Sequence, residues 1–100
     1  TEMNPPEEEV KRRIKKAREQ FDAGNYTPAL ELYRAVKREC NPSGKMELDA
    51  EDGMGSCLYH LQDFKGALPH RQRCLVLAGI IFGKQSMEYA VRLRAMGDVH

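Results

Sequence analysis

Two segments of the chain repeat one spacing of small and aromatic residues, and this repetition constrains the fold more than any other feature. Residues 17–29 and residues 55–67 both begin with a small residue and end with an alanine. An aromatic residue stands three positions before that alanine, Tyr26 in the first segment and Phe64 in the second. We expect the alanine to be small because two helices cross there, and the aromatic ring to fill the wedge beside the crossing. Such a unit leaves an apolar stripe uncovered, so it stacks on a neighbour.

Apolar residues recur along the chain at the three- and four-residue intervals of an α-helix. Val10, Ile14, Ala17 and Phe21 form the first such stripe. No alternation of apolar and polar residues lasts long enough to predict a strand. The fold class is therefore all-α with about five helices. They are expected near residues 7–23, 27–40 and 46–61, from residue 64 to an end between Gly79 and Gly83, and near residues 86–99.

Capping and breaking residues refine these boundaries. Thr27 is expected to cap the second helix, with Pro28 at its first helical position. Ser86 is a candidate cap for the fifth helix, and Pro69 is expected in the first turns of the fourth, where a missing N–H is tolerated. Glycines inside the third helix, at positions 53 and 55, each cost about 1 kcal/mol relative to alanine. We expect them to permit the close approach of another backbone.

The cysteines predict neither a disulfide framework nor a metal site. Cys40, Cys57 and Cys74 are odd in number and far apart in the sequence, which favours a reducing cytoplasmic setting, with the nucleus as the alternative. Cys40 and Cys74 lie on apolar stripes and are expected to pack as small hydrophobic residues. Cys57 and His60 share a helix face, but zinc requires four ligands, usually in paired short spacings. We expect no metal and no cofactor.

Length and charge set further bounds. The 100 residues, 41% of them hydrophobic and 31% charged, are too apolar for disorder and suffice for a single domain. A formal net charge of +1 implies neither a nucleic-acid nor a membrane partner. The apolar run at residues 75–82 is too short to span a bilayer. Because the chain begins with Thr1 and ends at His100 within a helical pattern, we expect it to be a segment of a longer protein.

The two repeated segments resemble the tetratricopeptide repeat, whose pattern is a small residue followed by Gly-x-Tyr-x-x-Ala. Met96 and Gly97 are similar to the Leu-Gly pair that opens a further repeat. The resemblance implies antiparallel helix hairpins stacked as an α-solenoid, with full repeats at about residues 7–42 and 46–82 and a partial third repeat or capping helix at about 86–99. The small residues at positions 17, 55 and 97 are farther apart than the typical repeat of about 34 residues. Longer repeats of this kind resemble those of kinesin light chain, of the spindle-orientation adaptors that bind G-protein α subunits, and of the C-terminal domain of SET-and-MYND methyltransferases.

In this family the first helix of each repeat lines a concave groove that holds a peptide or a helix. The resemblance places the groove at Lys11, Ile14, Arg18, Asp52, Ser56, Tyr59 and Arg94, with Phe21, Asp49 and Val91 at neighbouring positions. The mixed charge of these residues favours a peptide with both acidic and basic features. Some relatives clamp the C-terminal carboxylate of chaperones, but the matching positions here are Ile14, Arg18, Gly53, Val91 and Ala95. Since only the arginine among them can hold a carboxylate, we expect no chaperone tail as partner.

A basic run is the most concentrated local feature. It comprises Lys11, Arg12, Arg13, Lys15, Lys16 and Arg18. Such a run is typical of a nuclear-import signal or of a patch for anionic lipid or nucleic acid. A solvated helix face, partly neutralised by Glu7–Glu9 and Glu19, also accounts for the run and is the favoured interpretation.

These features favour a protein–protein interaction module that acts as a scaffold or adaptor. The alternative is an accessory domain of a larger enzyme or motor, such as a SET-and-MYND-type lysine methyltransferase or kinesin light chain, and a weaker alternative is binding of anionic lipid or nucleic acid through the basic run. No phosphate loop, nucleophile elbow or acidic catalytic motif is present, so we expect no catalytic residue and no small-molecule substrate. Met87, Leu93 and Met96 lie on one face of the fifth helix. If nothing covers that face, we expect self-association.

Overall fold

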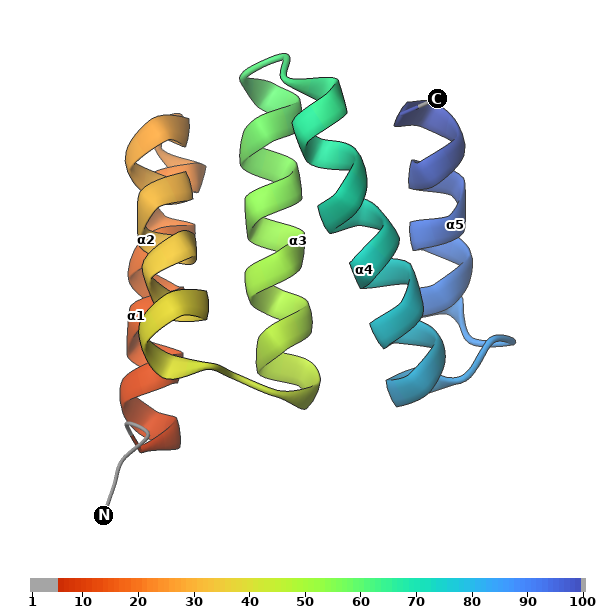
Figure 1. The fold of residues 1–100 in the computed structure, drawn as a ribbon, viewed down its shortest axis with the longest axis horizontal. Helices are drawn as coiled ribbons and strands as arrows, with labels where there is room; N and C mark the ends of the chain where they lie inside the picture. The colour runs from red at the N-terminus through yellow and green to blue at the C-terminus, as the bar shows by residue number, and fades with distance from the viewer. Residues whose placement is uncertain (1–5, 100) are drawn as a thin grey trace.

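Five helices make up the structure (Figure 1). The computed structural model describes the backbone of residues 6–99 and the side chains of residues 6–94. The helices are α1 (Glu7–Asp22), α2 (Tyr26–Cys40), α3 (Gly44–His60), α4 (Phe64–Phe82) and α5 (Met87–Val99). Residues 6–99 contain no strand. The expectation of an all-α fold with five helices is therefore confirmed, whereas the expectations that concern the side chains of Ala95, Met96 and Gly97 lie outside the described residues.

Each helix packs against the next one along the chain, and α1 also contacts α3. Figure 1 shows that consecutive helices run in opposite directions. α1 and α2 overlap in this view at one end of the longest axis, and α3, α4 and α5 follow along it. The principal extents are 41 × 30 × 19 Å. As a consequence α1 and α3 run in the same direction, so the starts of these two helices lie at one end of the molecule and their ends at the other.

The turns that join α1 to α2 and α3 to α4 have the same backbone conformation. The residue before the second helix has φ −91° and ψ 75° at Asn25, and φ −92° and ψ 76° at Asp63. In both turns its N–H donates a hydrogen bond to a carbonyl of the preceding helix, at 2.9 Å from Asn25 to Gln20 and at 2.8 Å from Asp63 to Leu58. The two halves of the chain therefore repeat one local structure as well as one sequence pattern.

This turn also explains why the expected cap at Thr27 is wrong. The hydrogen bond from Asn25 already fixes the chain at the end of α1, so α2 begins at Tyr26 and Asn25 takes the capping position. In the second turn the equivalent Asp63 caps α4 directly, because its carboxylate accepts a hydrogen bond of 3.0 Å from the Gly66 N–H.

The two turns differ at one position, and the difference predicts a stabilising substitution. Gly24 has φ +86° in the first turn, and Gln62 occupies the equivalent place in the second with φ +66°. A side chain in this left-handed conformation costs about 1 kcal/mol or more. We expect Gln62→Gly to raise the free energy of unfolding by about 0.5 kcal/mol, after the greater backbone entropy of glycine in the unfolded chain is subtracted. Thermal denaturation would show this, with Gln62→Ala as the control that should leave stability nearly unchanged.

The alanines that were expected at helix crossings belong to the buried core. Ala17, Ala29 and Ala67 are completely buried, in agreement with the requirement for small residues there. The aromatic residue beside each crossing is less enclosed than expected, since Phe64 is 46% exposed. Tyr26 stacks on the ring of His60, with 4.6 Å between the ring centroids. The aromatic rings therefore close the turn end of the molecule and do not fill an interior wedge.

The two glycines of α3 lie against side chains of neighbouring helices. The expectation of close contact with another backbone is therefore wrong at both positions. At Gly53 the ring of Tyr33 lies against the α3 backbone, and a Cβ atom there would come well inside 3.0 Å of it. At Gly55 the nearest atoms belong to His70, whose Cβ would be 3.4 Å away, and to Arg71. α3 is therefore shaped to receive one ring from α2 on one side and the side chains of α4 on the other.

The boundaries of α4 and α5 agree largely with the sequence. α4 runs to Phe82, which accounts for the longer spacing between the last two repeated positions. Ser86 caps α5, because its Oγ accepts a hydrogen bond of 3.1 Å from the Tyr89 N–H and donates one of 2.7 Å to the Gly83 carbonyl. Pro69 lies inside α4 and not in its first turn. It is exposed, and water can therefore satisfy the carbonyl that its missing N–H leaves free.

Candidate functional site

A groove between α1 and α3 consists of two adjoining clefts. The first has a volume of about 630 Å³ and lies where both helices begin. The second, of about 260 Å³, extends toward the ends of the two helices. Arg18 and Asp49 line both clefts. The first cleft is otherwise lined by Glu7, Lys11, Ile14, Lys15, Ser43, Lys45 and Met46, and the second by Phe21, Asp22, Tyr33, Asp52, Gly53 and Ser56.

Five of the seven groove residues named from the sequence line these clefts. Lys11, Ile14 and Arg18 line the first, and Arg18 with Asp52 and Ser56 lines the second. Ile14 is only 6% exposed, so it forms part of the floor and offers little surface to a ligand. The structure therefore brings together side chains from helices that are more than twenty residues apart in the sequence.

The other two residues lie elsewhere. Tyr59 packs against the ring of Phe64, with 5.2 Å between the centroids. The guanidinium of Arg71 lies over the Tyr59 ring, 5.8 Å from its centroid. Arg94 lines a small separate cleft of about 150 Å³ on α5, together with Met87, Ala90 and Val91. Neither residue borders the groove between α1 and α3.

Sequence reasoning missed the contribution of the start of α3. Ser43 and Lys45 line the first cleft, although neither was named as a groove residue from the sequence. Because α1 and α3 are parallel, the beginning of α3 lies beside the first turns of α1. The repeat in the sequence could have revealed this contribution. The alignment that places residue 17 on residue 55 also places Glu7, at the start of α1, on Lys45 at the start of α3.

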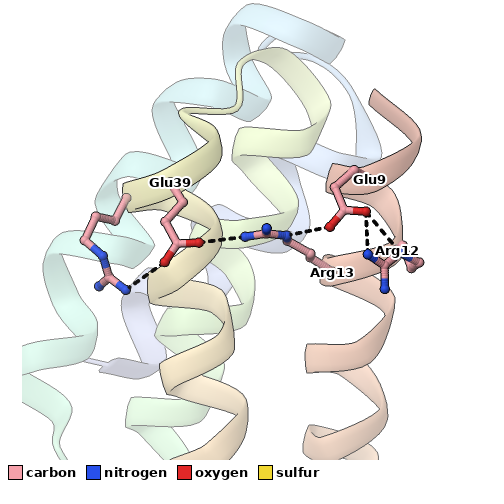
Figure 2. A network of polar contacts seen from close by, with 5 residues as sticks. Glu9, Arg12, Arg13 and Glu39 are labelled. Atoms are coloured by element: carbon pink, nitrogen blue, oxygen red, sulfur yellow. Dashed lines mark hydrogen bonds and ion pairs between the residues drawn. The ribbon is translucent and has the colours of Figure 1, made fainter. Parts of the chain in front are cut away.

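The basic run on α1 divides into two groups with different surroundings, and Figure 2 shows the first of them, Arg12 and Arg13. Arg12 and Arg13 both pair with Glu9, and Arg13 also donates a hydrogen bond of 2.8 Å from Nη1 to Glu39 of α2. The hydrogen bonds to Glu9 lower the pKa of its carboxyl, and that of Arg12 has the larger effect, followed by that of Arg13. The pKa of Glu39 is also lowered, mainly by its hydrogen bond with Arg13. Two of the six basic side chains are therefore held in a network between α1 and α2.

The other basic side chains of the run behave differently. Lys11, Lys15 and Arg18 follow one another at helical spacing and line the groove, while Lys16 is exposed outside it. Within residues 6–94 none of these four takes part in an ion pair. The run is therefore not a single patch of six free cations, which weakens the interpretation as a lipid or nucleic-acid site.

The acidic side of the groove is joined to α5. Asp52 accepts a hydrogen bond of 2.7 Å from Nη2 of Arg92, whose Nη1 donates a bond of 3.1 Å to the Glu88 carbonyl. Asp49 lies next to this pair on α3, and burial raises its pKa although the charge of Arg18 opposes the shift. Burial likewise raises the pKa of the Tyr33 hydroxyl at the floor of the second cleft. The groove thus has a partly desolvated wall of carboxylates.

A second cluster of charges connects α2, α3 and α4. Glu51 is 7% exposed and is bound by Lys37 at 3.0 Å and by His70 Nδ1 at 2.7 Å. Because an ionised carboxylate can only accept, His70 must donate from Nδ1. Glu47 joins the cluster through Lys37 at 3.2 Å and Arg73 at 3.0 Å. Each acid in this cluster is matched by basic partners from two other helices, which is the arrangement of a structural ion-pair network.

The three cysteines belong to the core. Cys40, Cys57 and Cys74 are free and buried, so the expectation that Cys40 and Cys74 pack as hydrophobic residues is confirmed. Burial raises the pKa of Cys57 to about 11, and burial together with the nearby Asp52 raises that of Cys74 further. Among the described residues, no group of three or more His, Cys, Asp and Glu side chains is placed to hold a metal ion.

Apolar side chains are exposed along α4 and α5. Ile80 and Met87 are 74% and 75% exposed, and Val76, Val91 and Leu93 are each more than half exposed. We expect these residues to drive reversible self-association, because exposed apolar groups of this size are unusual on a monomer. Sedimentation velocity at several concentrations should show a rising average mass. The double substitution Ile80→Glu and Met87→Glu should abolish that rise, and an unchanged rise would contradict the prediction.

Comparisons with known proteins return no relative. No protein-family model matches the chain, and no curated protein or solved structure is significantly similar to it. A search of the described residues for a helix long and apolar enough to cross a membrane finds none.

Proposed function

We propose that the chain is a tetratricopeptide-like helical repeat that binds a segment of a partner protein in the groove between α1 and α3. In this proposal the hairpins α1–α2 and α3–α4 are two full repeats, and α5 opens a third repeat or caps the second. The matching turns at Asn25 and Asp63 support the repeat, because they occur at equivalent places in the two segments that share one sequence pattern. The three buried thiols support a reducing compartment, the cytoplasm or the nucleus.

One observation carries the proposed binding role. Side chains from α1 and α3 line a groove open to solvent, and both helices are anchored below it by completely or almost completely buried residues such as Ala17, Leu48 and Cys57. A concave surface on a packed scaffold can receive an extended peptide or a partner helix at little cost in conformational entropy. An adaptor needs no more than this, and no chemistry beyond binding is required of the residues present.

Affinity capture from a cell lysate tests the proposal. Arg18→Glu reverses the charge at the junction of the two clefts, and Ser56→Trp fills the second cleft. We expect both substitutions to reduce the amount of captured partner at least fivefold. Lys16→Glu is the matched control, because it makes the same kind of charge change on the same helix but outside the groove. Equal recovery by all four proteins, with folding verified by circular dichroism, would refute a binding role for this groove.

A further inference from the structure

The two clefts of the groove carry opposite charge. Apart from the shared Arg18 and Asp49, the first cleft is lined by three lysines, Lys11, Lys15 and Lys45, against the single carboxylate of Glu7. The second cleft is lined by the carboxylates of Asp22 and Asp52 and by no further cation. The shared pair lies where the sign changes. The groove is therefore polarised along its length, which a mere count of its charges would not reveal.

The lysines of the first cleft are available to a ligand. Lys11, Lys15 and Lys45 are exposed, and none of them makes an ion pair within the part of the chain that the structure describes. α3 begins at Gly44 beside them, and its capping residue Ser43 makes no side-chain hydrogen bond to the first turn. The unsatisfied N–H groups there add partial positive charge to the same cleft. Ile14 and Met46 supply an apolar floor.

The second cleft attracts the opposite charge. Asp22 is exposed and without an ion pair among the described residues, whereas Asp52 is bound by Arg92 at 2.7 Å. Asp49 lies partly buried between the two clefts. A cationic ligand group there would offset the free-energy cost of burying its charged carboxylate. A basic side chain is therefore the best-matched group for this end of the groove.

The helix geometry gives the separation of the two ends. Asp22 lies seven residues beyond Lys15 and eleven beyond Lys11 on α1, which corresponds to about 10 to 17 Å along the helix axis. An extended peptide covers this distance in about three to five residues. The ligand charges must therefore be separated along the chain and not intermixed.

We propose that the groove binds an extended segment of a partner protein in which acidic side chains occupy the lysine-lined cleft and a basic side chain, about three to five residues away, occupies the cleft of Asp22, Asp49 and Asp52. This inference rests on the proposed function and specifies its ligand. It concerns acidic side chains within a peptide and requires no free C-terminal carboxylate.

Synthetic peptides test the polarity. A fluorescent eight-residue peptide, with both ends blocked, carries two glutamates, a neutral spacer of four residues and two lysines, and a second peptide has the reverse order along the chain. There are two control peptides. The first has the same composition with glutamate and lysine alternating, and the second has glutamine in place of every charged residue. Fluorescence anisotropy should show that one of the two segregated peptides binds at least tenfold more tightly than either control. Its affinity should fall steeply between 50 and 300 mM salt.

Charge reversal on the protein gives the decisive comparison. The variant Lys11→Glu/Lys15→Glu/Lys45→Glu should bind the segregated peptide at least tenfold more weakly and should gain affinity for a peptide with lysines at both ends. Lys16→Glu/Lys65→Glu/Lys84→Glu is the matched control, since it changes net charge equally at exposed lysines outside the groove. The single variants Lys45→Gln and Asp22→Asn, whose folds should be unaffected, should each weaken binding of the same peptide at least twofold.

The outcomes separate the inference from the proposed function. Equal binding of segregated, alternating and neutral peptides, abolished in each case by Ser56→Trp, would overturn the polarity and leave the groove as a peptide site. Loss of binding in both charge-reversed triple variants alike would also overturn it, because net charge alone would then explain the affinity. Absence of binding by every peptide would overturn the inference and argue against the proposed function as well.

Discussion

Replacing Gly53 by alanine is expected to lower the free energy of unfolding by about 2 kcal/mol and the melting temperature by about 10 °C. The reason is the ring of Tyr33, which lies where the new Cβ atom would be. Tyr33 is only 4% exposed and cannot turn away without leaving the core between α1, α2 and α3. The gain in helix propensity from alanine, about 1 kcal/mol, offsets only part of this overlap. Thermal or urea denaturation of the purified variant measures the loss.

Gly55→Ala is the matched control on the same helix. Its Cβ would meet the nearest atom, Cβ of His70, at 3.4 Å, an ordinary contact distance. We expect this variant to be as stable as the parent or more stable by up to about 1 kcal/mol. A double variant that combines Gly53→Ala with Tyr33→Leu should lose less stability than the sum of the two single changes, because the overlap disappears with the ring. Strict additivity would show that the ring is not the cause.

The helices and their buried faces could be predicted from the sequence because they depend on local periodicity. The stripe of Val10, Ile14 and Ala17 is buried as expected, and the paired alanines at positions 29 and 67 lie at helix contacts. The cap at Ser86 was also recognisable, since a serine before a helix needs only its own neighbours to act. These features are encoded within a few residues of where they occur.

What could not be predicted depends on contacts between distant residues. The role of Gly53 follows from a ring twenty residues earlier in the sequence, and glycine alone does not state what approaches it. The separation of Arg13 from the groove lysines follows from its ion pair with Glu39 on the neighbouring helix. Half of the candidate site was missed for the same reason. Periodicity identifies the buried face of each helix but not which exposed residues of parallel helices meet.

The second large effect is expected at the buried carboxylate of Glu51. Glu51→Gln should lower the free energy of unfolding at pH 7 by about 2 kcal/mol, because the amide retains the size of the side chain but loses the charge that binds Lys37 and His70. Lys37 keeps a partner in Glu47, which limits the loss. Glu31→Gln is the control. Its ion pair with Arg34 lies at the surface, with the glutamate side chain 66% exposed, and should contribute no more than about 0.5 kcal/mol.

The dependence on pH distinguishes the charge from the shape of the side chain. Burial raises the pKa of Glu51, but the hydrogen bonds of His70 and Lys37 outweigh it and hold the pKa below the ordinary 4.5. A carboxyl whose pKa is lower in the folded state binds a proton more readily when unfolded. Its stabilising effect is therefore complete above pH 4.5 and is lost as the pH falls through the folded value. We expect the difference in stability between the parent protein and Glu51→Gln to be present at pH 5 and to shrink toward pH 3. Urea denaturation at each pH measures this difference. Taking the difference also cancels the acid titration of other carboxyls such as Glu9 and Glu39. A difference that stays constant down to pH 3 would mean that packing, and not the ionised carboxylate, is what Glu51 contributes between α2, α3 and α4.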